Sequence, residues 1–128
     1  VEMAKHLTNE QRELVDVVKG MYSMKPESDP LVSKHYTSDC RFIDPLVEVA
    51  GQAHVKAQFR SLRMLFQDID FQVHGAGLVG EALVIQATVR YVPRLLPRMC
   101  TVQLEQFTHL TVSSGQVQVH EDHWSIHG

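Results

Sequence analysis

SDCRFIDP, residues 38 to 45, is a short apolar strand that ends in an aspartate and a proline. Because side chains alternate along a strand, Asp44 is expected to share a face with Cys40 and Phe42. If Phe42 points into the core, the carboxylate points inward as well, which is costly unless it is hydrogen-bonded or lines a cavity. Asp44 is therefore a candidate base. The alternative is that it only caps the turn at Pro45.

Helical spacing of apolar residues predicts three helices around this strand. The first runs from a capping residue at Thr8 to about Tyr22. The second begins at Asp29-Pro30, and its apolar side is formed by Leu31, Val32, His35 and Tyr36. The third follows Gly51 and carries an apolar stripe of Val55, Phe59, Leu62 and Phe66.

From Asp68 onward the apolar period changes to two, which predicts β-strands. One strand begins there, and three more are expected over 83–91, 99–111 and 116–126. Consecutive strands joined by short turns pair antiparallel. The helices must then cover one face of the sheet, which predicts an α+β fold with a pocket between its layers.

Composition limits the classes of partner. The 128 residues suit one domain, 1–128, with a real core. The net charge of −3 is spread along the chain, with no basic stripe, polybasic block or long apolar run. We therefore expect no nucleic-acid or membrane partner.

The two cysteines, Cys40 and Cys100, are far apart in the sequence. We expect reduced core thiols in a cytoplasmic protein, with a disulfide as the alternative. The segment Val1–Leu7 lacks the apolar stretch of a signal peptide, although a targeting segment trimmed before Val1 stays open.

The element order, the run SDCRFIDP and the run GQAHVKAQF at 51–59 resemble the ketosteroid isomerase / SnoaL-like branch of the nuclear transport factor 2-like superfamily. The resemblance covers nearly the whole chain. It implies a cone-shaped, curved antiparallel β-sheet covered by three N-terminal helices, and a homodimer. Both faces of the strand that carries Glu105 are partly apolar, so we expect the dimer interface on the back of the sheet. It indicates the fold more strongly than the activity, because many chemistries use this fold.

The resemblance assigns roles to four residues. Asp44 matches the general base of the isomerases, which also precedes a proline. Glu105, in the run QLEQF, falls where the isomerases keep a protonated aspartic acid that donates to the developing oxyanion. Trp124 and Tyr36 match pocket aromatics.

Other positions depart from the isomerase pattern. Met21 stands at the position of the main oxyanion tyrosine, and Tyr22 follows it about 100° round the helix. Phe59 replaces a second tyrosine and brings no hydroxyl. His120 and Asp122 replace mostly apolar pocket residues. One oxyanion donor is worth about 3 kcal/mol of barrier, so the loss of the phenol argues against steroid isomerase activity.

Two clusters leave alternatives open. Asp44 and Glu105 form an acid–base pair if both point inward, but Glu105 can equally lie on the outer face of its strand. The run 120–124, HEDHW, fits no known zinc spacing, so we expect no metal site. We expect His120 and Asp122 at the pocket rim, where such a pair can shuttle protons.

The connection with Leu95 and Leu96 contains two prolines that cannot enter a central ladder. It can form a pocket lid, a partner contact, or a loop folded back on its own domain. We favour the loop folded back.

Three functions follow. The first is a domain that binds a small apolar or carbonyl-bearing ligand without a cofactor. Its pocket would be lined by Phe42, Tyr36, Phe59, Phe107, Trp124, Met21, His120 and Asp122, with Asp44 as its polar anchor. The second is an isomerase- or cyclase-type enzyme in which Asp44 abstracts a proton next to a carbonyl, with Glu105 or Tyr36 supporting the enolate. The third is an interaction module that uses the back of the sheet and the Leu95-Leu96 tip.

Overall fold

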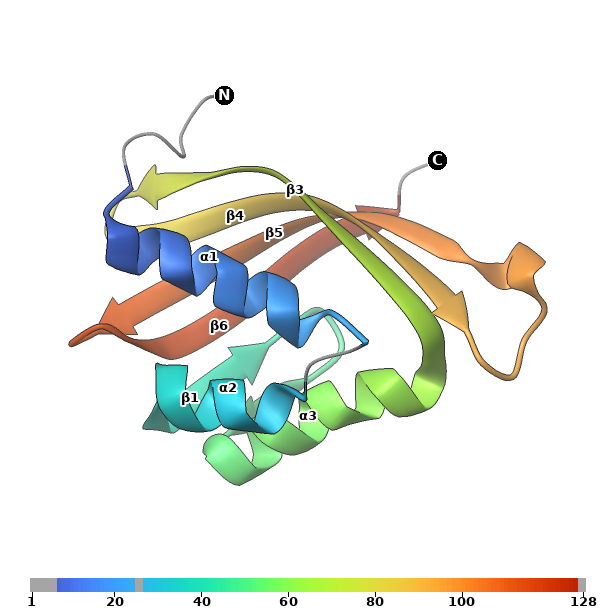
Figure 1. Cartoon of the computed structure of the whole chain (residues 1–128), viewed down its shortest axis with the longest axis horizontal. Helices are drawn as coiled ribbons and strands as arrows, with labels where there is room; N and C mark the ends of the chain where they lie inside the picture. The colour runs from blue at the N-terminus through green and yellow to red at the C-terminus, as the bar shows by residue number, and fades with distance from the viewer. Residues whose placement is uncertain (1–6, 25–26, 127–128) are drawn as a thin grey trace.

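The computed structural model describes residues 7–24 and 27–126 (Figure 1). In these ranges the elements are α1 (Asn9–Met21), α2 (Ser28–His35), β1 (Tyr36–Ile43), β2 (Glu48–Ala50), α3 (Gln52–Leu65), β3 (Phe66–Val79), β4 (Ala82–Pro93), the 3-10 helix η2 (Arg98–Cys100), β5 (Val102–Ser113) and β6 (Gln116–Ile126).

The start of α1 is set by a capping box. The Thr8 hydroxyl accepts from the Gln11 backbone N–H at 3.1 Å, and the Gln11 side chain accepts from the Thr8 N–H at 2.9 Å. This N-cap agrees with the sequence expectation. None of the described helices is long and apolar enough to cross a membrane.

The end of α2 differs from the expectation. The helix stops at His35, and Tyr36 is already extended, with φ −111° and ψ 145°. Tyr36 therefore begins β1 instead of closing the apolar side of the helix. The aromatic ring of Tyr36 and its β-branched successor Thr37 favour the extended chain.

The six strands form one sheet in the order β2-β1-β6-β5-β4-β3. All neighbours pair antiparallel except β1 and β6, which run parallel with Phe42 beside His120. The predicted α+β class is confirmed, but the sheet is mixed. The helix α3 carries the chain from the edge strand β2 to the opposite edge strand β3, and the returning strand β6 then lies beside β1 in the same direction. The three-residue strand β2 was not predicted, since it is too short to show a period.

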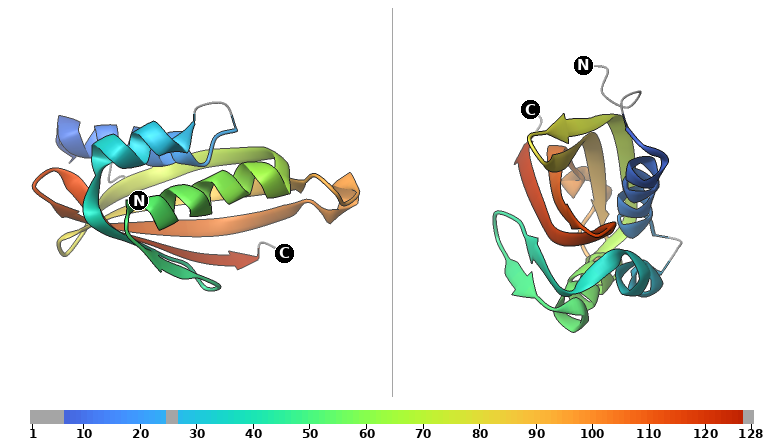
Figure 2. Two further views of the ribbon diagram at one scale, coloured as in Figure 1. Left: turned by 90° about the horizontal axis from the view of Figure 1, so that it is seen from below. Right: turned by 90° about the vertical axis from the view of Figure 1, so that its left-hand side faces the viewer.

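The sheet is curved and the helices lie on its concave side (Figure 2). Inward positions of β5 are buried at Leu104, Gln106, Thr108 and Leu110, and the alternating positions face outward. The core fills the space between this face and the helices. Its largest fully buried side chains include Tyr36, Phe59 and Met21.

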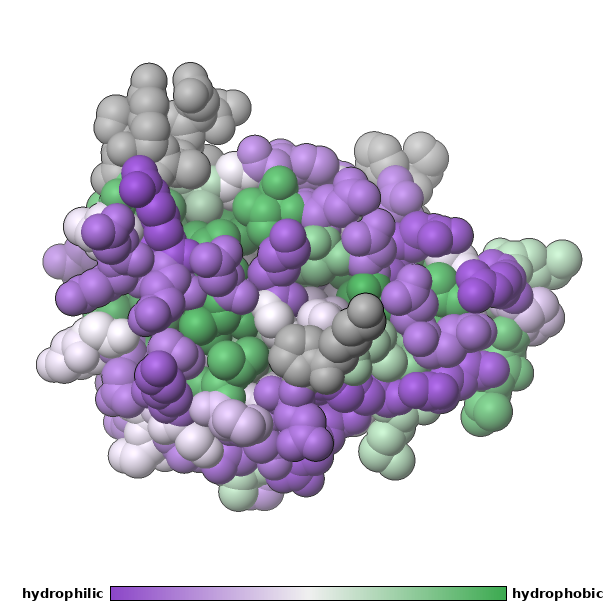
Figure 3. All heavy atoms as spheres, viewed as in Figure 1, coloured by the Kyte–Doolittle hydropathy of each residue, from purple (hydrophilic) through white to green (hydrophobic). Residues whose placement is uncertain are grey.

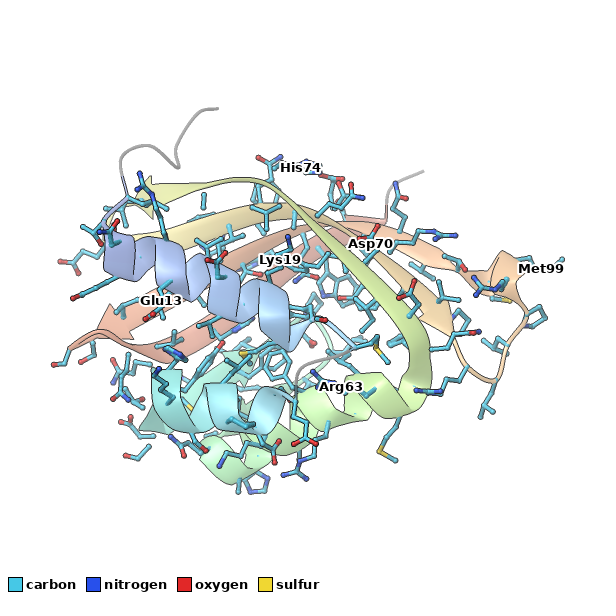
Figure 4. The ribbon with its side chains drawn as sticks, viewed as in Figure 1. Glu13, Lys19, Arg63, Asp70, His74 and Met99 are labelled. Atoms are coloured by element: carbon cyan, nitrogen blue, oxygen red, sulfur yellow. The ribbon has the colours of Figure 1, made fainter. Side chains whose placement is uncertain are left out.

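The connection between β4 and β5 projects from one end of the molecule, where hydrophobic and hydrophilic side chains lie together (Figure 3). Figure 4 shows Met99 at its tip. Leu95 is 96% exposed, and Leu96 is also exposed, so the expectation that this loop folds back is wrong. The backbone N–H of Arg94 donates to the Leu65 carbonyl at 3.0 Å, which holds the base of the loop to the end of α3.

The two cysteines are free, as expected, but only one is in the core. Cys40 is buried on β1, whereas Cys100 is exposed in η2. The expectation of a core thiol at Cys100 is wrong because η2 belongs to the projecting connection.

Candidate binding and acid–base site

A cavity of about 450 Å³ lies between α3 and the inner face of the sheet. Most of its wall is aromatic or aliphatic. The described residues that line it are Tyr22, Phe42, Asp44, Leu46, Val47, Gln58, Phe59, Ser61, Leu62, Leu65, Phe66, Tyr91, Val102, Leu104, Gln106, Asp122 and Trp124. Leu46, Leu65 and Val102 are exposed and form its mouth.

His120 and Asp122 lie at the buried end of this cavity. Both come from β6, two residues apart, so their side chains leave the same face of the sheet. The His120 Nε2 lies 3.0 Å from Asp122 Oδ1, and the two side chains are 0% and 2% exposed. Asp122 lines the cavity and His120 lies behind it. The sequence placed this pair at the rim, and the structure buries it instead.

Tyr22 brings a phenol to the same carboxylate. It is the C-cap of α1, where the helical wheel no longer applies, and its ring turns inward. Its hydroxyl donates to Asp122 Oδ2 and lies 3.3 Å from His120 Nε2. Burial, followed by the Asp122 charge, raises the pKa of Tyr22 well above its ordinary value. Tyr22 thus supplies the hydroxyl that Met21 lacks.

Tyr36 contacts the other nitrogen of the histidine. Its hydroxyl lies 2.6 Å from His120 Nδ1, and burial is the main cause that raises its pKa. If Tyr36 donates to Nδ1, then Nε2 carries the hydrogen and donates to Asp122. In this tautomer each of the two donors, the Tyr36 hydroxyl and the His120 Nε2–H, has an acceptor. Tyr36 does not line the cavity and acts behind the histidine.

Residues of β4 and β5 extend the network. Thr108 Oγ1 donates to Asp122 Oδ1 at 2.7 Å, and Gln106 Nε2 lies 3.4 Å from the Thr108 hydroxyl. The Tyr91 hydroxyl donates to Gln106 Oε1 at 3.3 Å. Asp122 therefore accepts hydrogen bonds at both oxygens, which stabilises a buried carboxylate.

Asp44 lines the cavity and also caps a turn. The inward position and the turn cap, which the sequence offered as alternatives, therefore occur together. Its Oδ1 accepts from the backbone N–H groups of Leu46 and Val47, each at 2.8 Å. Among the described residues no hydrogen bond reaches its Oδ2. Asp44 directly follows Ile43, the last residue of β1, which pairs with Glu121 of β6.

Glu105 and Phe107 lie on the outer face of β5, away from the cavity. Glu105 Oε2 accepts from the Thr88 hydroxyl at 2.9 Å. The structure does not bring Asp44 and Glu105 together, and Phe107 is not a wall of the pocket. The reason is strand parity, since the inward set on β5 is Leu104, Gln106, Thr108 and Leu110.

The remaining expected residues divide between wall and core. Phe42, Phe59 and Trp124 line the cavity, and the rings of Phe42 and Phe59 meet edge to face at 5.2 Å. Met21 is fully buried in the core but does not line the cavity. The described residues contain no group of three or more His, Cys, Asp or Glu that could hold a metal ion.

Four residues of the network, Tyr22, Tyr91, Gln106 and Thr108, were not assigned to the site from sequence. Side-chain alternation puts Tyr91 on the same face of its strand as the apolar residues Ile85 and Val89. This pattern could have identified Tyr91 as an inward residue. Gln106 and Thr108 lie on the face of β5 opposite to Glu105. They would have been predicted in the site if that face had been taken as the inner one. Tyr22 follows Val18 at helical spacing, which predicts a buried ring, but no local pattern shows that its hydroxyl reaches Asp122, 100 residues away.

Residues 29–120 match the family model of the SnoaL-like domain. The chain belongs to this family. No curated protein matches it in sequence. The resemblance inferred from SDCRFIDP and GQAHVKAQF is thereby confirmed.

Solved structures share the fold of this SnoaL-like domain. An LEH-like epoxide hydrolase from M. tuberculosis has a TM-score of 0.73 at 16% identity, over 92% of this chain and 84% of that one. A protein named as a SnoaL-like polyketide cyclase from Jannaschia sp. CCS1 has a TM-score of 0.73 at 20% identity, over 91% and 85%.

A protein of ketosteroid isomerase-like fold from Catenulispora acidiphila DSM 44928, in complex with trimethylamine, has a TM-score of 0.72 at 12% identity, over 86% and 85%. At these identities the likenesses show the fold alone.

Proposed function

We propose that this SnoaL-like domain binds a small, largely apolar molecule in the cavity between α3 and the sheet. The observation that carries the proposal is an apolar wall with a few convergent polar groups, in a volume of about 450 Å³. Ligand sites of this kind are concave, mostly apolar and oriented by a small number of polar groups. A structural neighbour in complex with a small molecule supports this assignment.

A bulky substitution at the mouth of the cavity tests the proposal. Val102 lines the cavity at its mouth, and Val112 lies on the same strand without lining it. Val102→Phe should abolish the rise in melting temperature produced by members of a steroid and polyketide library. Val112→Phe should retain it. The proposal fails if no compound stabilises the wild type, or if both variants respond alike.

A second candidate function is proton abstraction next to a carbonyl, with Asp44 as base. It is favoured by the open Asp44 Oδ2 in the cavity wall, whereas both oxygens of Asp122 accept hydrogen bonds. Nearby phenols of Tyr22 and Tyr91 also line the cavity. The reaction moves a proton from carbon to the carboxylate while the carbonyl oxygen takes up the negative charge.

Deuterium exchange into a bound ketone tests this chemistry. Asp44→Asn keeps the oxygen that caps the turn and removes the base. Wild-type protein should exchange the proton next to the carbonyl with solvent deuterium, and Asp44→Asn should not, as followed by NMR. Equal exchange by the two proteins contradicts this role.

A homodimer through the back of the sheet also stays a prediction. Phe107 lies on that outer face, 39% exposed, close to the His109–His123 ring contact. Phe107→Glu should convert a dimer to a monomer in sedimentation equilibrium, because it places a charge in an apolar contact. Thr111→Glu, nearer the end of the same strand, is the control. A wild type that is monomeric at every concentration contradicts the prediction.

A further inference from the structure

We propose that the cavity selects organic cations, that is, small molecules with an apolar body and a protonated amine. This inference rests on the proposed binding function and adds the charge of the ligand. It follows from the charges and rings in the wall, from the position of the two carboxylates, and from the engagement of the nearby cationic groups.

The charged groups in the wall are all of one sign. Asp44 and Asp122 line the cavity, and none of the described lining residues is Lys, Arg or His. A ligand carboxylate or phosphate would therefore meet two negative charges and no partner. A protonated amine would meet an opposite charge in an apolar surrounding, where such attraction is screened least.

The two carboxylates line the same cavity, one from the residue after β1 and the other from β6. Ile43, the last residue of β1, pairs with Glu121 of β6 in parallel register, and Asp44 and Asp122 are the residues that follow these two in the sequence. Phe42 and His120, one step before that pair, lie on the inner face with ring centroids 5.0 Å apart. Asp44 and Asp122 both face the cavity on this inner side of the sheet. A cation in this cavity would be attracted by both carboxylates.

Both carboxylates also act on one phenol. Burial first, and then the charges of Asp122 and Asp44, raise the pKa of Tyr91. Tyr91 lines the same cavity, so the negative field of both groups reaches the space that a ligand would occupy.

The nearby cationic groups have other partners. His120 lies behind Asp122, with its Nε2 3.0 Å from Asp122 Oδ1 and its Nδ1 2.6 Å from the Tyr36 hydroxyl, so both of its nitrogens have partners outside the cavity space. Arg63 of α3 donates to the Ser28 hydroxyl at 3.0 Å and the Ser23 carbonyl at 2.8 Å, which directs it toward the α1–α2 side (Figure 4). Arg41 forms an ion pair with Glu48.

The wall offers a second attraction for a cation. Six aromatic side chains line the cavity, namely Tyr22, Phe42, Phe59, Phe66, Tyr91 and Trp124. The face of an aromatic ring carries negative charge density and attracts ammonium groups, most strongly for tryptophan. Carboxylate oxygens and ring faces together make a site of the kind that holds a protonated or quaternary amine.

The available acceptor is Asp44 Oδ2. The two backbone bonds of Asp44 both end on Oδ1, and no described residue donates to Oδ2. Asp122 already accepts from Tyr22, Thr108 and His120. The ammonium group should therefore bond to Asp44, with Asp122 supporting it electrostatically.

Three probes with one apolar body test the inference: 1-(aminomethyl)adamantane, 1-adamantanemethanol and 1-adamantanecarboxylate. The chain has a single tryptophan, Trp124, in the cavity wall, so its fluorescence reports occupancy. At neutral pH the amine should bind at least ~10-fold more tightly than the alcohol, and the carboxylate more weakly than both.

The matched variant is Asp44→Asn, which retains the Oδ1 acceptor of the turn. It should weaken amine binding about 10-fold and leave alcohol binding within about 2-fold, whereas Glu81→Gln, in the β3–β4 turn, should change neither. Alcohol binding equal to or tighter than amine binding overturns the cation inference and leaves the binding function intact. Failure of all three probes at millimolar concentration overturns both. Amine preference that survives in Asp44→Asn also overturns the assignment to this carboxylate.

Discussion

Strand β6 carries two histidine–acid pairs that face opposite sides of the sheet. On the inner side His120 and Asp122 lie 3.0 Å apart with 0% and 2% of their side chains exposed. On the outer side His123 and Glu121 lie 3.3 Å apart with 56% and 39% exposed. The same chemical groups, in one run of four residues, are thus a buried network in one case and a solvated pair in the other. The face of the sheet, and not the residue types, decides what each pair can do.

The largest expected effect is alkaline loss of stability on the inner side. The chain has three tyrosines, and Tyr22, Tyr36 and Tyr91 are all buried with raised pKa values. Above pH 10 the unfolded chain loses these protons and the folded chain keeps them, so stability is full below that pH and falls as the pH rises. At pH 11 the loss should be about 4 kcal/mol, or about 1.4 kcal/mol for each tyrosine.

Urea unfolding at pH 9 and pH 11, followed together with tyrosinate absorbance, measures this. Absorbance should appear only as the protein unfolds. Tyrosinate that forms in the folded protein near pH 10 would show that the inner network is open to solvent. The inner and outer sides of β6 would then not differ in solvent access.

The next effect compares the two acids directly. Asp122→Asn replaces an acceptor of three hydrogen bonds with an amide at a side chain that is only 2% exposed, which should cost about 3 kcal/mol. Glu121→Gln changes an exposed pair and should cost less than about 0.5 kcal/mol. Chemical denaturation of the two variants gives the difference. Equal losses of unfolding free energy would mean that burial does not make the inner pair more important for stability than the outer pair.

The smallest effect belongs to the outer face. Partial burial, and then the neighbouring His123, lowers the pKa of His109 below its usual value. The unfolded chain therefore binds this proton more readily, and stability falls slightly as the pH decreases below about 6.5. His123→Asn should move the His109 pKa part of the way back, because burial remains.

NMR titration of the imidazole resonances measures that shift. A His109 pKa that does not move in His123→Asn would show that the 4.9 Å ring contact carries no electrostatic effect.

The sequence predicted the helix start at Thr8, the α+β class and the inward face of Phe42, because these depend on local caps and on periods of two and 3.6. It also placed His120, Asp122 and Trp124 on one face. The alternation of side chains could not show which side of β5 faces the core, since both sides carry apolar residues. Glu105 was therefore assigned to the pocket, whereas the structure places Gln106 on that inner side.

Local sequence thus determined which residues share a face, as that follows from backbone geometry alone. The tertiary structure decided which face is buried, how deep His120 and Asp122 lie, and that Tyr22 reaches them from the end of α1. These depend on contacts between residues about one hundred positions apart, such as Tyr22 with Asp122. No local pattern encodes such contacts, because they form only when the curved sheet closes against its helices.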